Sequence, residues 1–314
     1  MFSFGRSLQY IRPVLALVAF FLLLYFIQEI GFAKLLTLAL SFSPAWVCVV
    51  MICLVANISI AAIRYRVLVA PELEYSKVLE IIMAGYLLNY ASMIQGLGLG
   101  AKIALLKRQN VSVSRSIAGS IGEIFLDIIF TGTVSAVFFT YMGLEVFEYE
   151  YSTKFLIIIL IGVLCIAFGL HLISRISGFA KKLIENLKVT FAVKNLPVGI
   201  LSTVGIWIIG GAGYYFMIIA SGTPYENIQP GLVFAAISVG FIIGLISFVP
   251  GGLGIRDITW AYVASMAGTP IEVSGTAALL LRLVSVLTVI LWLGLWTFYK
   301  RKKQIIWKII ARIG

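Results

Sequence analysis

The chain has 314 residues, of which 61% are hydrophobic and 12% are charged, and its net charge is +11. Soluble globular proteins have about 45–50% apolar and about 25% charged residues, so this composition excludes a soluble enzyme. The sequence also contains apolar runs of about 20 residues, the length that crosses a hydrocarbon core of about 30 Å. We therefore predict an all-α polytopic membrane protein.

Six segments are long and apolar enough to span a membrane. They lie at about 11–30, 44–63, 117–142, 155–174, 198–220 and 276–299. The first segment follows two arginines, as the apolar region of a signal peptide does. It offers no small-x-small cleavage site, so we interpret it as a retained helix.

The connections between these spans alternate in charge. Basic residues follow the second and fourth spans, whereas three glutamates follow the third. The basic residues after the second span are Arg64, Arg66 and Lys77, and the glutamates are Glu145, Glu148 and Glu150. By the positive-inside rule the basic connections and the basic tail 300–314 are cytoplasmic. This places both termini in the cytoplasm and predicts an integral protein of the plasma (inner) membrane. It also explains the net charge without nucleic acid as a partner. The tail is either an interfacial amphipathic helix or a solvated segment.

The apolar stretch 78–113 does not fit this alternation, because basic residues flank both of its ends. A chain that enters and leaves a membrane on one side must turn back inside it. Three glycines at alternate positions, Gly96, Gly98 and Gly100, favour a break in the helix there. We predict a re-entrant helical hairpin with these glycines as hinges.

A second stretch, 231–268, follows an outer loop that has no lysine or arginine, and it precedes a span that must run inward. It too must turn back, with hinges at Pro250, Gly251, Gly252 and Gly254. We therefore predict a second re-entrant hairpin that enters from the opposite face. Such irregular backbone is tolerated at membrane depth only where protein buries it or water reaches it.

The two hairpins share a short pattern. Residues 98–102 (Gly-Leu-Gly-Ala-Lys) match residues 252–256 (Gly-Leu-Gly-Ile-Arg) at an offset of 154 positions. The pattern predicts one transmembrane domain over 1–314, built from a repeat at 44–142 and an inverted repeat at 198–299. Many secondary transporters have inverted repeats with broken helices that meet near the midplane.

Two regions of the chain resemble a known family. The first is 85–89 (Gly-Tyr-Leu-Leu-Asn) with Gly122-Glu123 and Asp127, and the second is 250–257 (Pro-Gly-Gly-Leu-Gly-Ile-Arg-Asp) with Arg282 about a helix later. They resemble the membrane domain shared by lysylphosphatidylglycerol synthases and stand-alone flippase-like proteins.

This resemblance covers essentially the whole chain, with two departures. The first turn reads Ile94-Gln95-Gly96, where the family commonly has a proline before its glycine, and Asp257 stands where glutamate is more frequent. The resemblance implies movement of a lipid or lipid-linked precursor between leaflets. Because no soluble aminoacyl-transfer domain follows, we expect no lipid aminoacylation.

Six charged residues lie inside the predicted membrane region: Lys102, Glu123, Asp127, Arg256, Asp257 and Arg282. Each costs about 2.5–3.5 kcal/mol at the bilayer centre, so each should face a cavity or a partner. Glu123 and Asp127 lie four residues apart on one helix face, and we expect them to pair with Arg282 across the repeats.

These charges have two interpretations. They are either buried ion pairs that hold the repeats in register, or a substrate site in which Arg256 and Lys102 bind a lipid phosphate near helix N-termini. Lys102 has a third option, which is to extend to the cytoplasmic surface. In the site interpretation, Asp257 orients Arg256. Three polar residues, Asn57, Asn89 and Gln95, either make interhelical hydrogen bonds or line a cavity.

The function that we predict is a membrane lipid translocase for an anionic phospholipid or a polyprenyl-phosphate lipid. The alternative is a non-transporting subunit that presents such a lipid to a partner enzyme, for instance a glycosyltransferase. We expect no enzyme activity, metal or cofactor, because the sequence has no nucleophile–base pair, metal-ligand cluster or nucleotide-binding motif. An intramembrane enzyme and a solute transporter are weaker alternatives, and homo-oligomerisation stays open.

Overall fold

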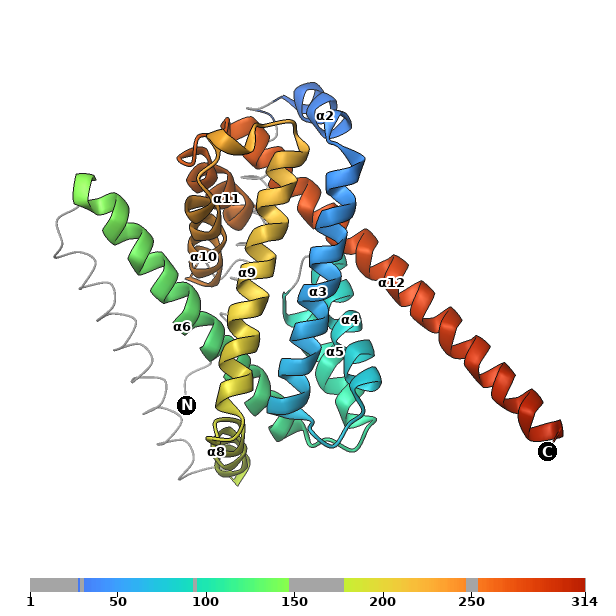
Figure 1. Ribbon diagram of the computed structural model, residues 1–314. Coiled ribbons are helices and arrows are strands. Elements are labelled where there is room, and N and C mark those ends of the chain that lie inside the picture. Colours follow the sequence, from blue (N-terminus) through green and yellow to red (C-terminus); the bar gives the residue numbers. More distant parts are fainter. Residues whose placement is uncertain (1–27, 29–30, 93–94, 147–177, 247–253, 314) are drawn as a thin grey trace.

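The computed structural model describes residues 28, 31–92, 95–146, 178–246 and 254–313 (Figure 1). Every regular element in these ranges is a helix, which confirms the all-α prediction. Four helices are long and apolar enough to cross a membrane: α3 (Pro44–Val69), α6 (Val113–Val146), α9 (Leu196–Ala220) and α12 (Ile271–Ile313). They coincide with four of the predicted spans. The span expected at 155–174 lies outside the described residues, as does all of 11–30 except Gln28.

Two pairs of shorter helices pack against each other within the bundle. The first pair is α4 (Tyr75–Ser92) with α5 (Gln95–Lys107), and the second is α10 (Pro230–Ile246) with α11 (Ile255–Ser265). With 13 and 11 residues, α5 and α11 are about 20 and 17 Å long, too short to cross a core of about 30 Å. In Figure 1 the α4–α5 pair lies in the lower half of the molecule and the α10–α11 pair in the upper half. The two hairpins thus enter from opposite ends.

The predicted hinge glycines of the first hairpin do not interrupt a helix. Gly96, Gly98 and Gly100 all lie inside α5, which already begins at Gln95. Gly98 serves close packing instead, because a Cβ at this position would overlap Asn89 Oδ1 and the carbonyl oxygen of Gly85 on α4. The expectation that these glycines form the turn is therefore wrong.

The turn of the second hairpin, 247–253, lies outside the described residues, and with it the predicted hinges Pro250, Gly251 and Gly252. Gly254 is described, and it precedes the first residue of α11 with φ +74°. A side chain would be strained in this conformation, which glycine adopts readily. Gly254 thus sets the angle at which the chain enters α11.

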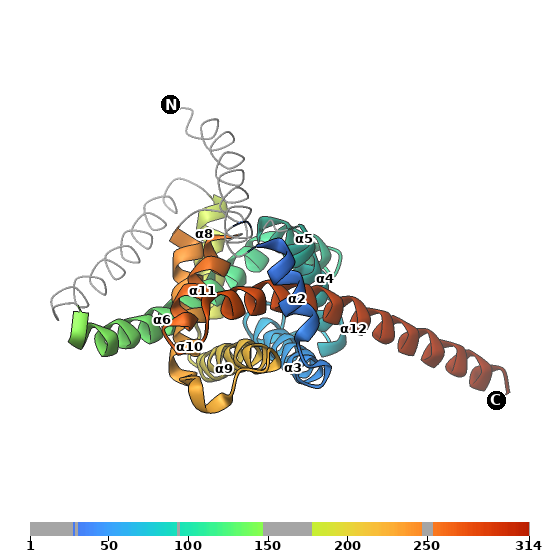
Figure 2. The same ribbon diagram turned by 90° about the horizontal axis from the view of Figure 1, so that it is seen from above.

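Both halves of the structure have the same order of elements: a long helix, a hairpin of two short helices and another long helix. In Figure 1, α3 runs from the upper to the lower end and α9 runs back, and these two helices share the largest helix–helix contact. The last helix of each half packs on the hairpin of the other half, α6 on α10 and α12 on α4. Figure 2 shows α6 and α12 leaving the bundle on opposite sides. The ranges predicted for the repeats, 44–142 and 198–299, contain most of these two sets of helices; α9 begins two residues earlier, and α6 and α12 extend beyond the predicted ends.

The two ends of the bundle differ in charge. The lower end of Figure 1 carries α8 (Gly178–Thr190) and the ends of α3, α5 and α6. Exposed basic residues collect on these elements, on the start of α4 and just after α5: Arg66, Lys77, Lys107, Arg108, Lys181, Lys182 and Lys188. We call this the basic end. The opposite end carries α2 (Phe32–Ser41), the short 3-10 helix η1 (Tyr225–Asn227) and one ion pair between Lys34 and Glu272 at 3.1 Å.

Candidate functional site

A buried arginine on α3 organises the first group of interior charges. Arg64 donates from Nη1 to Asp127 Oδ1 at 2.7 Å and from Nη2 to Asp127 Oδ2 at 3.2 Å, and its Nε donates to Glu123 Oε1 at 3.2 Å. Its Nη1 also donates to Thr203 Oγ1 on α9 at 3.0 Å. The guanidinium fork therefore compensates both carboxylates of α6 at once, and a planar fork suits this bidentate contact.

Lys102 on α5 completes this group. Its Nζ lies 3.7 Å from Glu123 Oε2 and 4.8 Å from the centroid of the Tyr65 ring. Arg64, Lys102, Glu123 and Asp127 form what we call the first charge cluster, with two cations and two carboxylates. Since opposite charges balance in it, the cluster resembles a closed structural network more than an open anion site.

A second charge cluster, Arg256, Asp257 and Arg282, joins α11 to α12. Arg282 Nη2 lies 2.8 Å from Asp257 Oδ2, and the Asp257 side chain is 1% exposed. The same Oδ2 accepts a hydrogen bond from the Gly254 backbone N–H at 3.2 Å, so Asp257 caps the N-terminus of α11. The guanidinium carbon of Arg256 lies 4.8 Å from the centroid of the Trp260 ring, a cation–π distance. This cluster has two cations and one carboxylate.

The predicted pairing of Glu123 and Asp127 with Arg282 is therefore wrong. Each half supplies its own counter-charge, Arg64 in the first and Asp257 in the second. Asp257 also has a role that the sequence did not predict, because it caps α11 and holds Arg282.

Sequence reasoning missed Arg64 because it placed this residue in a cytoplasmic connection. The helix α3 continues to Val69, six residues beyond the predicted end of the span, and Arg64 lies on its buried face. The signal was present in the sequence, since Ala61, Tyr65 and Leu68 continue the apolar helical period on both sides of Arg64.

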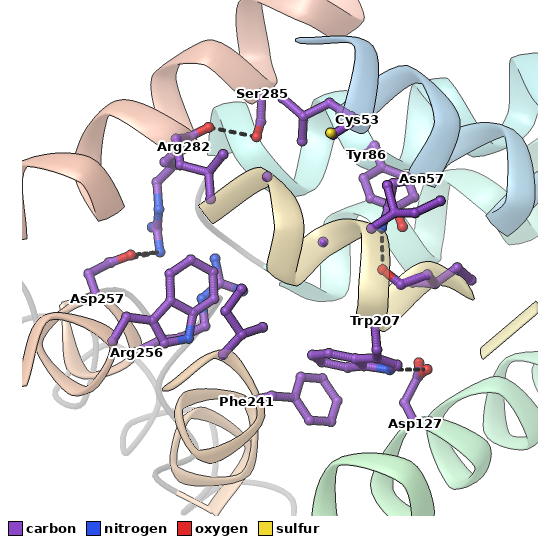
Figure 3. A pocket seen from close by; sticks show the side chains of 18 of the residues that line it. Cys53, Asn57, Tyr86, Asp127, Trp207, Phe241, Arg256, Asp257, Arg282 and Ser285 are labelled. Atoms are coloured by element: carbon purple, nitrogen blue, oxygen red, sulfur yellow. Dashed lines mark hydrogen bonds and ion pairs between the residues drawn. The ribbon is translucent and has the colours of Figure 1, made fainter. Parts of the chain in front are cut away.

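The two clusters meet at one cavity with a volume of about 220 Å³. Figure 3 shows Arg256, Asp257 and Arg282 on one side of it and Asn57, Trp207 and Asp127 on the other. Arg64 lines it too, so among the described lining residues three arginines accompany two aspartates. Lys102, Glu123 and Asn89 are not among the described lining residues.

Hydrogen bonds and aromatic rings shape the wall opposite the second charge cluster. Trp207 Nε1 donates to Asp127 Oδ1 at 2.9 Å, and the Trp207 ring packs edge-to-face on Phe241 with centroids 5.0 Å apart. Asn57 Nδ2 donates to the Ile206 carbonyl oxygen at 2.6 Å. Asn57 therefore both joins α3 to α9 and lines the cavity, which are the two options left open for it.

Asn89 has the structural role. Its Oδ1 accepts a hydrogen bond from the Gly98 backbone N–H at 3.0 Å, which ties α4 to α5 near the first turn of α5. Of the two options predicted for Asn89, the structure therefore shows the interhelical hydrogen bond.

The arrangement is suited to binding an anion. Guanidinium groups form strong, directional hydrogen bonds to phosphate oxygens, and these interactions strengthen away from water. Within the described part of the chain, Arg282 Nε is a buried donor with no hydrogen-bond partner. Arg282 also lines the cavity, with Arg64 and Arg256. No three His, Cys, Asp or Glu side chains come together as a metal site among the described residues.

These features define a polytopic helical membrane protein with a charged interior cavity between two hairpins. A sequence model of the family described as the lysylphosphatidylglycerol synthase TM region matches residues 13–294, and the chain belongs to this family. This confirms the resemblance seen at 85–89 and 250–257, and makes the chain a membrane protein of lipid metabolism or transport. A comparison with curated proteins found no match.

Proposed function

We propose that the protein is a translocase that moves a phosphate-bearing lipid between the leaflets of the plasma (inner) membrane, with its basic end in the cytoplasm. The lipid is an anionic phospholipid or a polyprenyl-phosphate lipid, and no chemical step is involved. The observation that carries the proposal is the interior cavity, in which three described arginines accompany two aspartates. The family name supports a lipid with a phosphatidylglycerol-type headgroup.

The second charge cluster is the place for the phosphate. In the first cluster Arg64 bonds both carboxylates and Lys102 lies beside Glu123, so its positive charges are already matched. The second cluster contributes two guanidinium groups and one carboxylate to the cavity wall. A phosphate between Arg256 and Arg282 would meet two guanidinium groups, which bind phosphate oxygens through strong, directional hydrogen bonds.

The hairpins supply a physical reason for movement between leaflets. A charged headgroup needs a polar path across the hydrocarbon core, while its acyl chains stay in lipid. The α4–α5 hairpin reaches inward from the basic end, and the α10–α11 hairpin from the other end. Tyr86 of the first hairpin and Arg256 of the second both line the cavity, so it is bordered by elements from both ends.

The test is leaflet exchange in proteoliposomes with fluorescent phosphatidylglycerol and a polyprenyl-phosphate analogue. We expect the wild-type protein to accelerate exchange of at least one of them, and Arg256→Gln to abolish the acceleration. Arg66→Gln is the matched control, because Arg66 is exposed at the basic end. A wild-type protein that moves neither lipid overturns the proposal, and one that binds a lipid without exchange favours the presenting subunit instead.

A second variant tests the cavity without removing any charge. Gly210 lines the cavity, and a Cβ there meets only Asn57 Nδ2, at 3.4 Å. Gly210→Leu places an apolar side chain in this wall of the cavity and takes up part of its volume. We expect it to stop exchange, while Gly205→Ala on the same helix, whose Cβ would meet only Ile60 at 3.5 Å, leaves exchange intact.

A further inference from the structure

We propose that α2 is an interfacial helix whose Leu36 and Leu40 side chains insert between the lipids of the leaflet at the end opposite the basic end. This surface lies outside the cavity, because none of the described cavity-lining residues belongs to α2. The proposed contact with the leaflet is therefore a second interaction of the protein with lipid, separate from the translocation path.

The length and position of α2 place it at a membrane surface. With 10 residues it is about 15 Å long, half of what a hydrocarbon core of about 30 Å requires. Figure 1 shows it at the upper end of the molecule, where the chain turns into α3. Lys34 pairs there with Glu272 in the first turn of α12, and the Ser43 backbone N–H donates to the carbonyl oxygen of Ala220, the last residue of α9, at 2.7 Å. The helix and its connection to α3 are thus fixed to the ends of two spans.

The exposed surface of α2 is divided into an apolar side and a polar side. Six described side chains are exposed, Ala33, Leu36 and Leu40 on one side and Lys34, Thr37 and Ser41 on the other. At about 100° per residue, each set occupies a sector of about 60°. Leu36 is 51% exposed and Leu40 is 80% exposed. This division is typical of a helix that lies in a membrane interface, with one side toward acyl chains and the other toward water.

Aromatic side chains mark the membrane boundary at the same end. Trp46 lies in the first turn of α3, is exposed, and stacks on Phe216 of α9 with ring centroids 5.5 Å apart. Tyr225 of η1 is exposed at this end as well. Tryptophan and tyrosine collect where hydrocarbon meets water, because their rings are amphipathic. Further along α3, Ile52 is exposed on a membrane span, so an apolar outer surface begins shortly after α2.

The ion pair of α2 indicates which side faces water. Lys34 Nζ lies 3.1 Å from Glu272 Oε1, and the two side chains are 57% and 32% exposed. A charge pair with this exposure is stable in water and costly in hydrocarbon. The polar side of α2 therefore faces water, and the apolar side faces lipid. Since α12 carries Arg282 ten residues after Glu272, α2 also holds the start of a cavity-lining helix at the leaflet surface.

Quenching of site-specific fluorophores tests the proposal on the full-length protein in vesicles of phosphatidylcholine and phosphatidylglycerol. The native cysteines are replaced by serine, and one probe is attached at Leu36→Cys or Leu40→Cys. The matched controls carry the probe on the polar side, at Thr37→Cys or Ser41→Cys. We expect a nitroxide high on the lipid acyl chain to quench the apolar-side probes at least several-fold more than the controls. Iodide on both sides of the membrane should quench them in the opposite order.

A double variant tests whether the two leucines make the contact. The probe is moved to Ala33→Cys at the edge of the apolar side, and Leu36→Asn with Leu40→Asn is compared with Thr37→Asn with Ser41→Asn. We expect lipid quenching of this probe to fall in the leucine double variant and to keep its original level in the control. All four side chains are exposed, so neither change disturbs the packing, and equal melting temperatures in detergent would verify this.

The possible outcomes separate lipid from the other occupants of this surface. Iodide access to the Leu36 and Leu40 probes, or equal nitroxide quenching on both sides, would mean that the apolar side faces water and would overturn the proposal. Protection from both quenchers would mean that protein covers it, for instance a second copy of the chain, and would overturn it too. Unchanged lipid quenching in the leucine double variant would refute the role of the leucines. Since no lipid exchange is measured, each result is independent of the proposed translocase.

Discussion

Replacing Arg64 with methionine should destabilise the protein more than any other single arginine replacement on α3. Methionine keeps much of the side-chain volume but removes three hydrogen bonds to carboxylates, two to Asp127 and one to Glu123. The side chains of Glu123 and Asp127 are only 7% and 15% exposed, so both carboxylates would lose their main compensating charge in a largely buried setting. Removal of one partner from a buried ion pair costs about 3–5 kcal/mol.

Thermal unfolding of the purified protein measures this effect. At about 2–4 °C for each kcal/mol, a loss of about 3–5 kcal/mol should lower the Tm of Arg64→Met by about 6–20 °C. The control is Arg66→Met on the same helix. Arg66 is exposed, and among the described residues it donates only to the Leu73 carbonyl oxygen, at 2.9 Å, so its loss should cost at most about 1 kcal/mol.

A triple variant separates the charge effect from lost packing. Arg64→Met combined with Glu123→Gln and Asp127→Asn leaves no uncompensated carboxylate, and replacement of a whole buried ion network is often nearly neutral. We expect the triple variant to recover most of the lost stability. If Arg64→Met melts within about 2 °C of Arg66→Met, or if the triple variant recovers nothing, the first charge cluster is not the balanced network described above.

Two further predictions concern the first hairpin and the cavity. Gly98→Ala should cost about 1–3 kcal/mol in unfolding free energy, because its Cβ would overlap Asn89 Oδ1. The control is Gly100→Ala, which has no described neighbour within 4 Å and should be neutral or stabilising. Equal melting temperatures of the two variants would contradict the packing role of Gly98. Cys53 is a free cysteine that lines the cavity. In a variant whose other cysteines are replaced by serine, saturating phosphatidylglycerol should slow the reaction of Cys53 with a small thiol reagent at least several-fold. An unchanged rate would show that the lipid binds elsewhere.

The layout of the membrane helices could be predicted from the sequence because it follows from two local properties. Mean hydropathy marks the spans, and the sign of the flanking charges marks which apolar stretches turn back. Both properties can be read without knowing which helices pack together. For this reason the hairpins at 78–113 and 231–268 were predictable even though α5 and α11 are too short to span.

The pairing of the interior charges could not be predicted in the same way. Whether Arg64 or Arg282 compensates Asp127 depends on which helix faces which, and this is decided by the packing of α3 against α6 and of α11 against α12. The positive-inside rule also treats each arginine near a span as a boundary marker, which placed Arg64 in a loop. When the apolar positions of a helix continue with the same periodicity beyond a charged residue, that residue is better interpreted as buried. For Arg64, the two carboxylates of another span, Glu123 and Asp127, indicated that it had partners there.

The two halves are alike in sequence at their cations but differ in what those cations do. Lys102 and Arg256 occupy equivalent positions in the repeated pattern, and each lies 4.8 Å from an aromatic ring centroid, Tyr65 for the lysine and Trp260 for the arginine. Yet Lys102 lies beside Glu123 outside the described cavity lining, whereas Arg256 lines the cavity. The difference follows from the carboxylates, because α6 carries two of them at this depth and α12 carries an arginine instead. A repeat that keeps the cation while the facing helix changes from carboxylates to an arginine gives, among the described residues, one cluster with two carboxylates and one with a single carboxylate, and the proposed function assigns the phosphate to the second.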